Sequence, residues 1–160
     1  MVERWVVDAS PLIILARIGR QDLFDLADEV LIPPAVVAEI VAGPPDDPAR
    51  RLVEGGFGRR IGTPAVSERV LAWGLGRGET EVISAALEER RATVVLDDAA
   101  GRRCAKALRL PLIGTLGLVG RAAREGRIDA VSAIFDSLRE AGFRADERLL
   151  ADLLDRLRAK

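Results

Sequence analysis

Five acidic side chains have the types and positions that could do chemistry: Asp8, Glu39, Glu79, Asp97 and Asp98. Asp8 closes an apolar run at residues 5–7, and the adjacent aspartates close another at residues 93–96. The carboxyl ends of parallel strands form the crevice where α/β proteins bind ligands, so acids at two strand ends can meet there. Several carboxylates in one place repel each other unless a cation joins them, and oxygen-rich sites of this kind suit Mg²⁺ or Mn²⁺.

The acids at the two strand ends carry the stronger argument. A charge at the end of a buried strand is costly unless it is paired or lies at the open end of the sheet. Helix capping would also explain Asp8, but Ser10 and the proline after it already fit the start of the next helix. Adjacent side chains in an extended segment point to opposite sides. We therefore expect one of Asp97 and Asp98 to face the site and the other to cap the helix that follows.

The two glutamates have adequate structural explanations of their own. Glu79 lies at a helix N-terminus, where an acid stabilises the helix dipole by roughly 0.3–1 kcal/mol. Glu39 lies within the apolar segment 36–41, and a crevice edge and a solvated helix face explain it equally well.

Three basic residues follow the aspartate pair on one predicted helix: Arg102, Arg103 and Lys106. Arg102 and Lys106 share a helix face by their four-residue spacing, and could receive a phosphate backbone beside the acids. Solvated surface is the plainer explanation for all three.

The composition restricts the class of protein. A chain of 160 residues with 49% hydrophobic residues suits one folded domain, and its net charge of −1 argues against a generally basic nucleic-acid binder. The absence of histidine and the single cysteine exclude zinc fingers, Ser-His-Asp triads and intramolecular disulfides. There is no dinucleotide-binding glycine motif, no P-loop and no tyrosine for a base-stacking platform. Without a signal peptide or a membrane-spanning stretch, we expect a cytoplasmic protein.

The pattern of apolar runs and helix breakers predicts alternating strands and helices. Strands are expected at residues 2–7, 30–32, 93–96 and 111–113, with 57–61 as a candidate edge strand. Helices are expected from Ser10 to Gly19, at 21–26, 35–41, 46–54, 67–73, 78–89 and 99–108, and at 116–124 with Thr115 as its cap. This alternation implies a mostly parallel sheet with helices on both faces. Residues 1–127 should form the main domain. Residues 128–160 should form a helical hairpin, joined at Gly142, that packs on that domain or on a partner subunit.

Together these features resemble the PIN-domain superfamily, particularly the VapC-like toxin ribonucleases and a related prokaryotic branch with a C-terminal helical extension. The order and spacing of the motifs carry the resemblance, which covers roughly residues 2–145. The matching stretches are Val-Val-Asp-Ala-Ser-Pro-Leu at 6–12, Ile-Pro-Pro-Ala-Val at 32–36 leading to Glu39, Gly-Glu-Thr-Glu-Val-Ile at 78–83, Val-Leu-Asp-Asp at 95–98 and Ile-Gly-Thr-Leu-Gly at 113–117.

The resemblance implies a three-layer α/β/α nuclease domain that hydrolyses single-stranded RNA with water activated by Mg²⁺ or Mn²⁺. Its acidic quartet would be Asp8, Glu39, Glu79 and Asp98, with Asp97 as a supporting or alternative metal ligand and Ser10 holding a water molecule. Glu79 stands where an aspartate is usual, and the neighbouring Glu81 competes with it for that role. The resemblance also implies a homodimer and a small antitoxin partner. The alternative function is a PIN-fold module that binds nucleic acid or protein without cleaving it.

Overall fold

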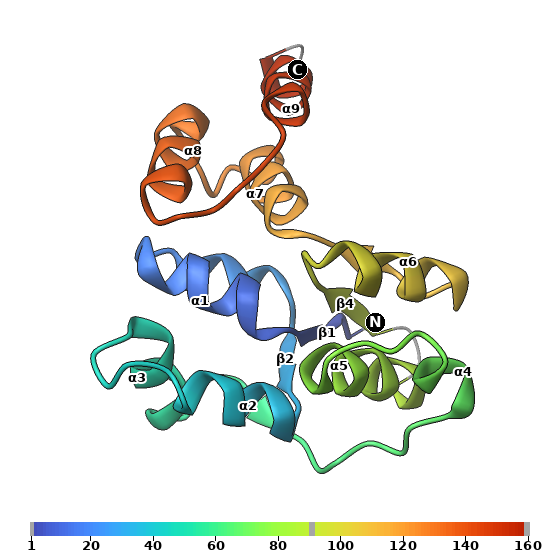
Figure 1. The fold of residues 1–160 in the computed structure, drawn as a ribbon. Coiled ribbons are helices and arrows are strands. Elements are labelled where there is room, and N and C mark those ends of the chain that lie inside the picture. The colour runs from blue at the N-terminus through green and yellow to red at the C-terminus, as the bar shows by residue number, and fades with distance from the viewer. Residues whose placement is uncertain (1, 90–91, 159–160) are drawn as a thin grey trace.

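The computed structural model describes residues 2–89 and 92–158 and has a five-stranded sheet at its centre (Figure 1). The strands stand in the order β3-β2-β1-β4-β5, and every neighbouring pair is parallel. Their bounds are β1 Arg4–Val7, β2 Glu29–Ile32, β3 Arg59–Arg60, β4 Thr93–Val95 and β5 Leu112–Ile113. The predicted parallel sheet is confirmed, and the candidate edge strand at 57–61 contributes only the two residues of β3.

Helices cover both faces of the sheet, which confirms the predicted α/β/α layering. Figure 1 shows α1 and α3 on one side and α5 and α6 on the other. The helices are α1 Ala9–Arg17, the 3-10 helix η1 Gln21–Leu26, α2 Pro34–Val41, α3 Pro48–Glu54, α4 Glu68–Leu71, α5 Arg77–Glu88, α6 Ala99–Ala107, α7 Thr115–Arg124, α8 Val131–Glu140 and α9 Glu147–Arg158.

The central strand β1 brings the two aspartate-bearing strand ends together. Trp5, Val6 and Val7 are fully buried, as expected for a strand covered by helices on both faces. Val7 pairs with Val95 of β4, and the backbone N–H of Asp8 donates to the Val95 carbonyl over 3.0 Å. The ends of β1 and β4 therefore lie side by side, as the placement of the acids required.

Two helix starts differ from the sequence-based prediction. α1 begins at Ala9 rather than after Ser10, because the backbone turns into the helix as soon as Asp8 has completed its strand pairing. Asp8 occupies the N-cap position, but its side chain makes no capping hydrogen bond. Thr115 is not the cap of α7 but its first residue, because its hydroxyl and amide both donate to the Asp97 carboxylate instead.

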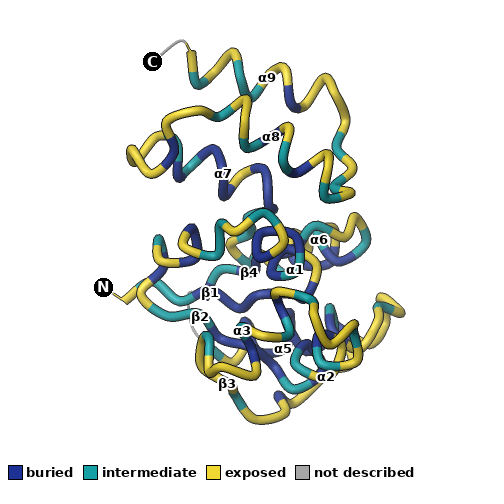
Figure 2. The backbone as a smooth tube through the Cα atoms, turned by 90° about the vertical axis from the view of Figure 1, so that its left-hand side faces the viewer, coloured by how far each residue is buried: buried dark blue, intermediate teal, exposed yellow. Residues whose placement is uncertain are grey.

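The C-terminal helices extend the same hydrophobic core. Phe135 and Leu138 of α8 and Leu150 of α9 are buried and belong to the cluster that contains the central strand. In Figure 2, exposed residues run along α8 and α9, whereas much of α7 is buried. α9 thus packs against α7, and α8 joins the core through Phe135 and Leu138, with the polar sides of both helices outward.

Among residues 2–89 and 92–158, no helix combines the length and apolar character needed to cross a membrane.

Candidate active site

All five acids predicted from the sequence line one cavity at the carboxyl end of the sheet. The cavity has a volume of about 520 Å³. Asp8 reaches it from the end of β1, Glu39 from α2, Glu79 from α5, and the aspartate pair from the connection between β4 and α6. Ser10 lines the same cavity from α1. The fold therefore brings together residues that are 90 positions apart in the sequence.

Asp8 is the most constrained of the acids. Its side chain is buried, with a residue exposure of 3%, and its Oδ1 atom has no hydrogen-bond partner. The pKa of Asp8 is raised to about 7, chiefly by burial and next by the charge of Glu79, with smaller contributions from Glu39 and Asp97 and a lowering by the Ala9 N–H. A positive charge close to this carboxyl would favour its ionised form.

The N-terminus of α5 faces two of the carboxylates because a glycine occupies its second position. A β-carbon on Gly78 would lie 3.3 Å from Oδ1 of Asp8 and 3.9 Å from Oε1 of Glu39. Both oxygens therefore point at the same stretch of helix. The pKa of Glu39 is raised by partial burial and by the charge of Glu79. Glu39 and Glu79 line the same cavity as Asp8.

Glu81, the alternative to Glu79, binds the backbone of α2 instead of lining the cavity. It is buried, with 6% exposure, and its Oε1 accepts the backbone N–H of Ala35 over 2.8 Å. Ala35 lies in the first turn of α2, so Glu81 fastens the start of that helix and stands at its positive end. Glu79 lines the acidic cavity and Glu81 does not.

The two adjacent aspartates divide their work. Asp97 accepts two hydrogen bonds from Thr115, one from the amide at 2.8 Å and one from the hydroxyl at 2.5 Å, and its charge reaches Asp8. Asp98 caps α6, its Oδ2 accepting the Gly101 N–H over 2.8 Å, and its side chain is more exposed. Both line the cavity, but only Asp97 is held by Thr115, which follows β5 at the start of α7.

The basic residues expected to bind substrate separate in the structure. Arg102 donates from Nη1 to the carbonyl of Leu96 over 3.0 Å and lines a second cavity of about 250 Å³, which also contains Asp97. Arg103 and Lys106 are exposed on α6 and line neither cavity.

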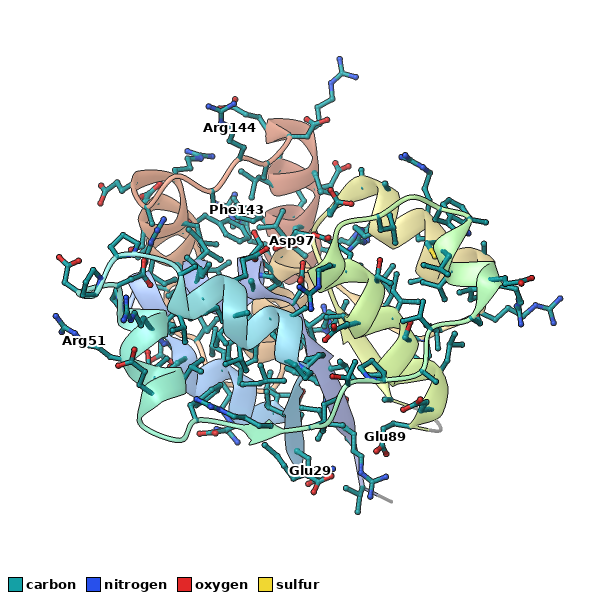
Figure 3. The ribbon with its side chains drawn as sticks, turned by 60° about the horizontal axis from the view of Figure 1, so that its bottom comes forward. Glu29, Arg51, Glu89, Asp97, Phe143 and Arg144 are labelled. Carbon is teal, nitrogen blue, oxygen red and sulfur yellow. The ribbon has the colours of Figure 1, made fainter. Side chains whose placement is uncertain are left out.

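Other residues that line the acidic cavity were not predicted from the sequence, among them Arg17, Phe143 and Arg144. Arg17 is the last residue of α1 and forms an ion pair with Asp47, with 3.1 Å between Nη2 and Oδ2. Figure 3 shows Phe143 between Arg144 and Asp97, with Glu29 at the opposite end of the molecule. The glycine at position 142 signals the end of α8, but no sequence signal shows that the chain then returns to the edge of the sheet.

The acids fit a hard divalent cation by their chemistry. Every donor is a carboxylate oxygen, and the buried Oδ1 of Asp8 lacks a partner within the protein. Within the described parts of the chain, no three His, Cys, Asp or Glu side chains stand close enough to hold a metal ion as they are.

Comparison with known proteins agrees with this geometry. A family model described as a PIN domain matches residues 4–159, which includes all of α8 and α9. A search of curated proteins found no match. PIN domains are typically nucleases that act on nucleic acid, and they generally use divalent metal ions. Because the match extends over almost the whole chain and the acids converge where the fold requires, the chain belongs to the PIN-domain family.

Proposed function

We propose that this protein is an endoribonuclease that hydrolyses phosphodiester bonds in single-stranded RNA with Mg²⁺ or Mn²⁺. The observation that carries the proposal is the convergence of Asp8, Glu39, Glu79 and Asp97 on one cavity at the carboxyl end of the sheet. A phosphodiester adds negative charge to this set, so a cation has to join substrate and protein. The choice of single-stranded RNA rests on the resemblance to VapC-like toxins.

The five acids have distinct roles in this proposal. Asp8, Asp97 and Glu79 would hold the ion, with Glu39 completing the acidic set and Asp98 serving mainly as the cap of α6. Such an ion supplies Lewis-acid stabilisation of the phosphate charge and activates water. Thr115 keeps Asp97 in one orientation, and Ser10 offers a hydroxyl beside Asp8 that can orient water.

We further propose that the protein acts as a toxin, forms a homodimer and is inhibited by a small antitoxin. These points rest on the resemblance to VapC-like proteins. Expression in bacteria gives the test: wild-type protein should arrest growth and Asp8→Asn should not. Equal growth of both strains at equal protein levels would contradict the toxin role but not the nuclease activity, which is tested separately with purified protein.

The test of the nuclease chemistry is an incubation of purified protein with structured and unstructured RNAs, with Mn²⁺ or with EDTA. We expect cleavage of unstructured RNA that requires the metal and is abolished by Asp8→Asn. Asp152→Asn is the matched control, because Asp152 is an exposed acid of α9 outside the acidic cavity. Equal cleavage by wild type and Asp8→Asn would refute the proposed site.

The second candidate function is a PIN-fold module that binds nucleic acid without cleaving it. The observation that favours it is the spacing of the acids, since no three of them in the described residues are close enough to ligate one ion as they stand. Calorimetric titration with Mn²⁺ separates the two. Metal binding without cleavage of any RNA would favour the binding module, and metal-dependent cleavage would exclude it.

A further inference from the structure

A short segment between the last two helices passes over the acidic cavity. This bridge segment consists of residues 143–145, between the end of α8 and the N-cap of α9. Phe143 and Arg144 line the 520 Å³ acidic cavity, and the same two residues, together with Asp97, line the 250 Å³ cavity beside it. The bridge segment is therefore the wall that the two cavities share.

The bridge segment is held firmly at its first end. The N–H of Phe143 donates to the carbonyl of Leu138 over 2.9 Å, and the N–H of Gly142 donates to the carbonyl of Arg139 over 3.0 Å. Gly142 has a φ of +97°, which a glycine adopts without strain. Together these bonds form a Schellman motif, which fixes the direction in which the chain leaves α8.

The other end is held by the start of α9. Asp146 accepts the N–H of Arg148 on its Oδ1 over 2.8 Å, and its carbonyl accepts the N–H of Leu150 over 3.1 Å. Only three residues lie between Gly142 and Asp146. Phe143 and Arg144 thus belong to a short, fastened connection rather than to a long loop, which suits residues that must hold a ligand in one position.

The charges around the bridge segment suit a strand of nucleic acid. Arg144 is exposed, and none of the ion pairs formed within residues 2–89 and 92–158 includes it. The acidic cavity lies on one side of it. On the other side, the second cavity carries the guanidinium of Arg102 close to Gly114, where a β-carbon would lie only 2.6 Å from Nη1. The second cavity is thus lined by the two arginines Arg102 and Arg144, together with Asp97 and Asp146.

We infer that the bridge segment is a substrate-binding element: Arg144 binds the backbone phosphate next to the one that is cleaved, and Phe143 supports the adjoining nucleotide as the strand enters the Arg102 cavity. The inference rests on the proposed function, since it takes the acidic cavity as the place of cleavage. Arginine suits this role because its planar guanidinium binds phosphate oxygens in pairs. Phe143 offers one aromatic ring, on which a single base can stack without sequence preference.

The experiment measures binding without turnover. Anisotropy of a labelled unstructured RNA is followed in Mn²⁺, in an Asp8→Asn background that should not cleave the RNA, at several KCl concentrations. Arg144→Ala should weaken binding by about tenfold and reduce the slope of log affinity against log salt by roughly 0.7, the value for one phosphate contact on a single strand. Arg144→Lys should restore the slope. Phe143→Leu should weaken binding and leave the slope unchanged.

Arg148→Ala is the matched control, because Arg148 is an exposed arginine on α9 that lines neither cavity. Equal effects of Arg144→Ala and Arg148→Ala, or no saturable binding of RNA, would overturn the inference. The result is separate from the nuclease assay. Binding that depends on Arg144 in a protein that never cleaves RNA would support the binding element and refute the proposed ribonuclease.

Discussion

Replacing Asp8 by asparagine should stabilise the metal-free protein, and should do so only above a certain pH. The pKa of Asp8 is raised from 3.8 to about 7, chiefly by burial. A group whose pKa is higher in the folded protein contributes stability through its bound proton. That contribution is complete below the unfolded pKa of 3.8 and is lost as the pH rises through about 7. Above that range the wild-type protein carries a buried charge that asparagine does not have.

The magnitude follows from the difference between the two pKa values. Each unit corresponds to about 1.4 kcal/mol, so the rise from 3.8 to about 7 corresponds to about 4 kcal/mol at alkaline pH. The buried amide of asparagine still has to be desolvated, so about 4 kcal/mol is a ceiling for the gain. Domains of this size are stable by roughly 5–15 kcal/mol, so the effect is large enough to measure.

The measurement is urea unfolding in EDTA from about pH 4 to about pH 9, with the free energy of unfolding obtained by linear extrapolation. The difference between Asp8→Asn and wild type cancels the titration of the other groups. It should be close to zero at the acid end and should grow across neutral pH. Asp152→Asn, an exposed acid of α9, should show a small difference that does not change with pH.

Adding Mn²⁺ should reverse the order of stability. An ion that binds only the folded protein stabilises it by mass action, and wild type should gain more than Asp8→Asn. A difference between the two proteins in EDTA that stays constant from acid to alkaline pH would refute the reasoning, because it would mean that Asp8 is not perturbed in the folded state.

Two further substitutions test how the acids are held. Thr115→Val removes a fully buried hydroxyl that donates to Asp97, and should lower kcat for RNA about tenfold or more because a hydrogen bond to a charged group is lost. Thr93→Val on β4 is the matched control. Equal activity of the two variants would contradict the role of Thr115. Glu81→Ala leaves the Ala35 N–H without its partner, and should lower the free energy of unfolding in urea by about 1–3 kcal/mol while each folded molecule still cleaves RNA. Glu79→Ala should abolish cleavage with little loss of stability. The reverse pattern would exchange the roles of the two glutamates.

The sheet and the position of Asp8 could be predicted because both depend on local pattern. Apolar runs marked the strands, and parallel topology alone placed their carboxyl ends along one edge. Glu39 and Glu79 could not be assigned in this way. Each has an ordinary explanation on its own helix, and only the packing of α2 against α5 brings them together. The resemblance to PIN domains supplied what the local pattern lacked.

The roles of Asp97 and Asp98 could not be read from the sequence for a different reason. The alternation of side chains predicts that the two differ, but it does not show which one caps the helix. In the structure both line the cavity, Asp98 caps α6, and Asp97 is held by two hydrogen bonds from Thr115, 18 positions away in the sequence. The same hydroxyl accounts for the wrong prediction that Thr115 caps α7, since a carboxylate acceptor competes successfully with the helix end. Phe143 and Arg144 were missed because the docking of α8 and α9 depends on tertiary packing.

The acids at this site are not supported equally, and the difference bears on metal binding. Asp97 receives two hydrogen bonds from Thr115, and Asp98 receives one from α6, so the fold itself orients both. Asp8 is more deeply buried than either, yet its Oδ1 receives no hydrogen bond from any described residue. In the absence of an ion, this carboxyl is a source of instability at neutral pH. A bound divalent cation would remove that cost, so part of the affinity for the ion comes from relief of a strain that folding imposes on Asp8. Asp8, whose Oδ1 has no hydrogen bond from the described residues, is thereby the acid that contributes most to binding of the cation.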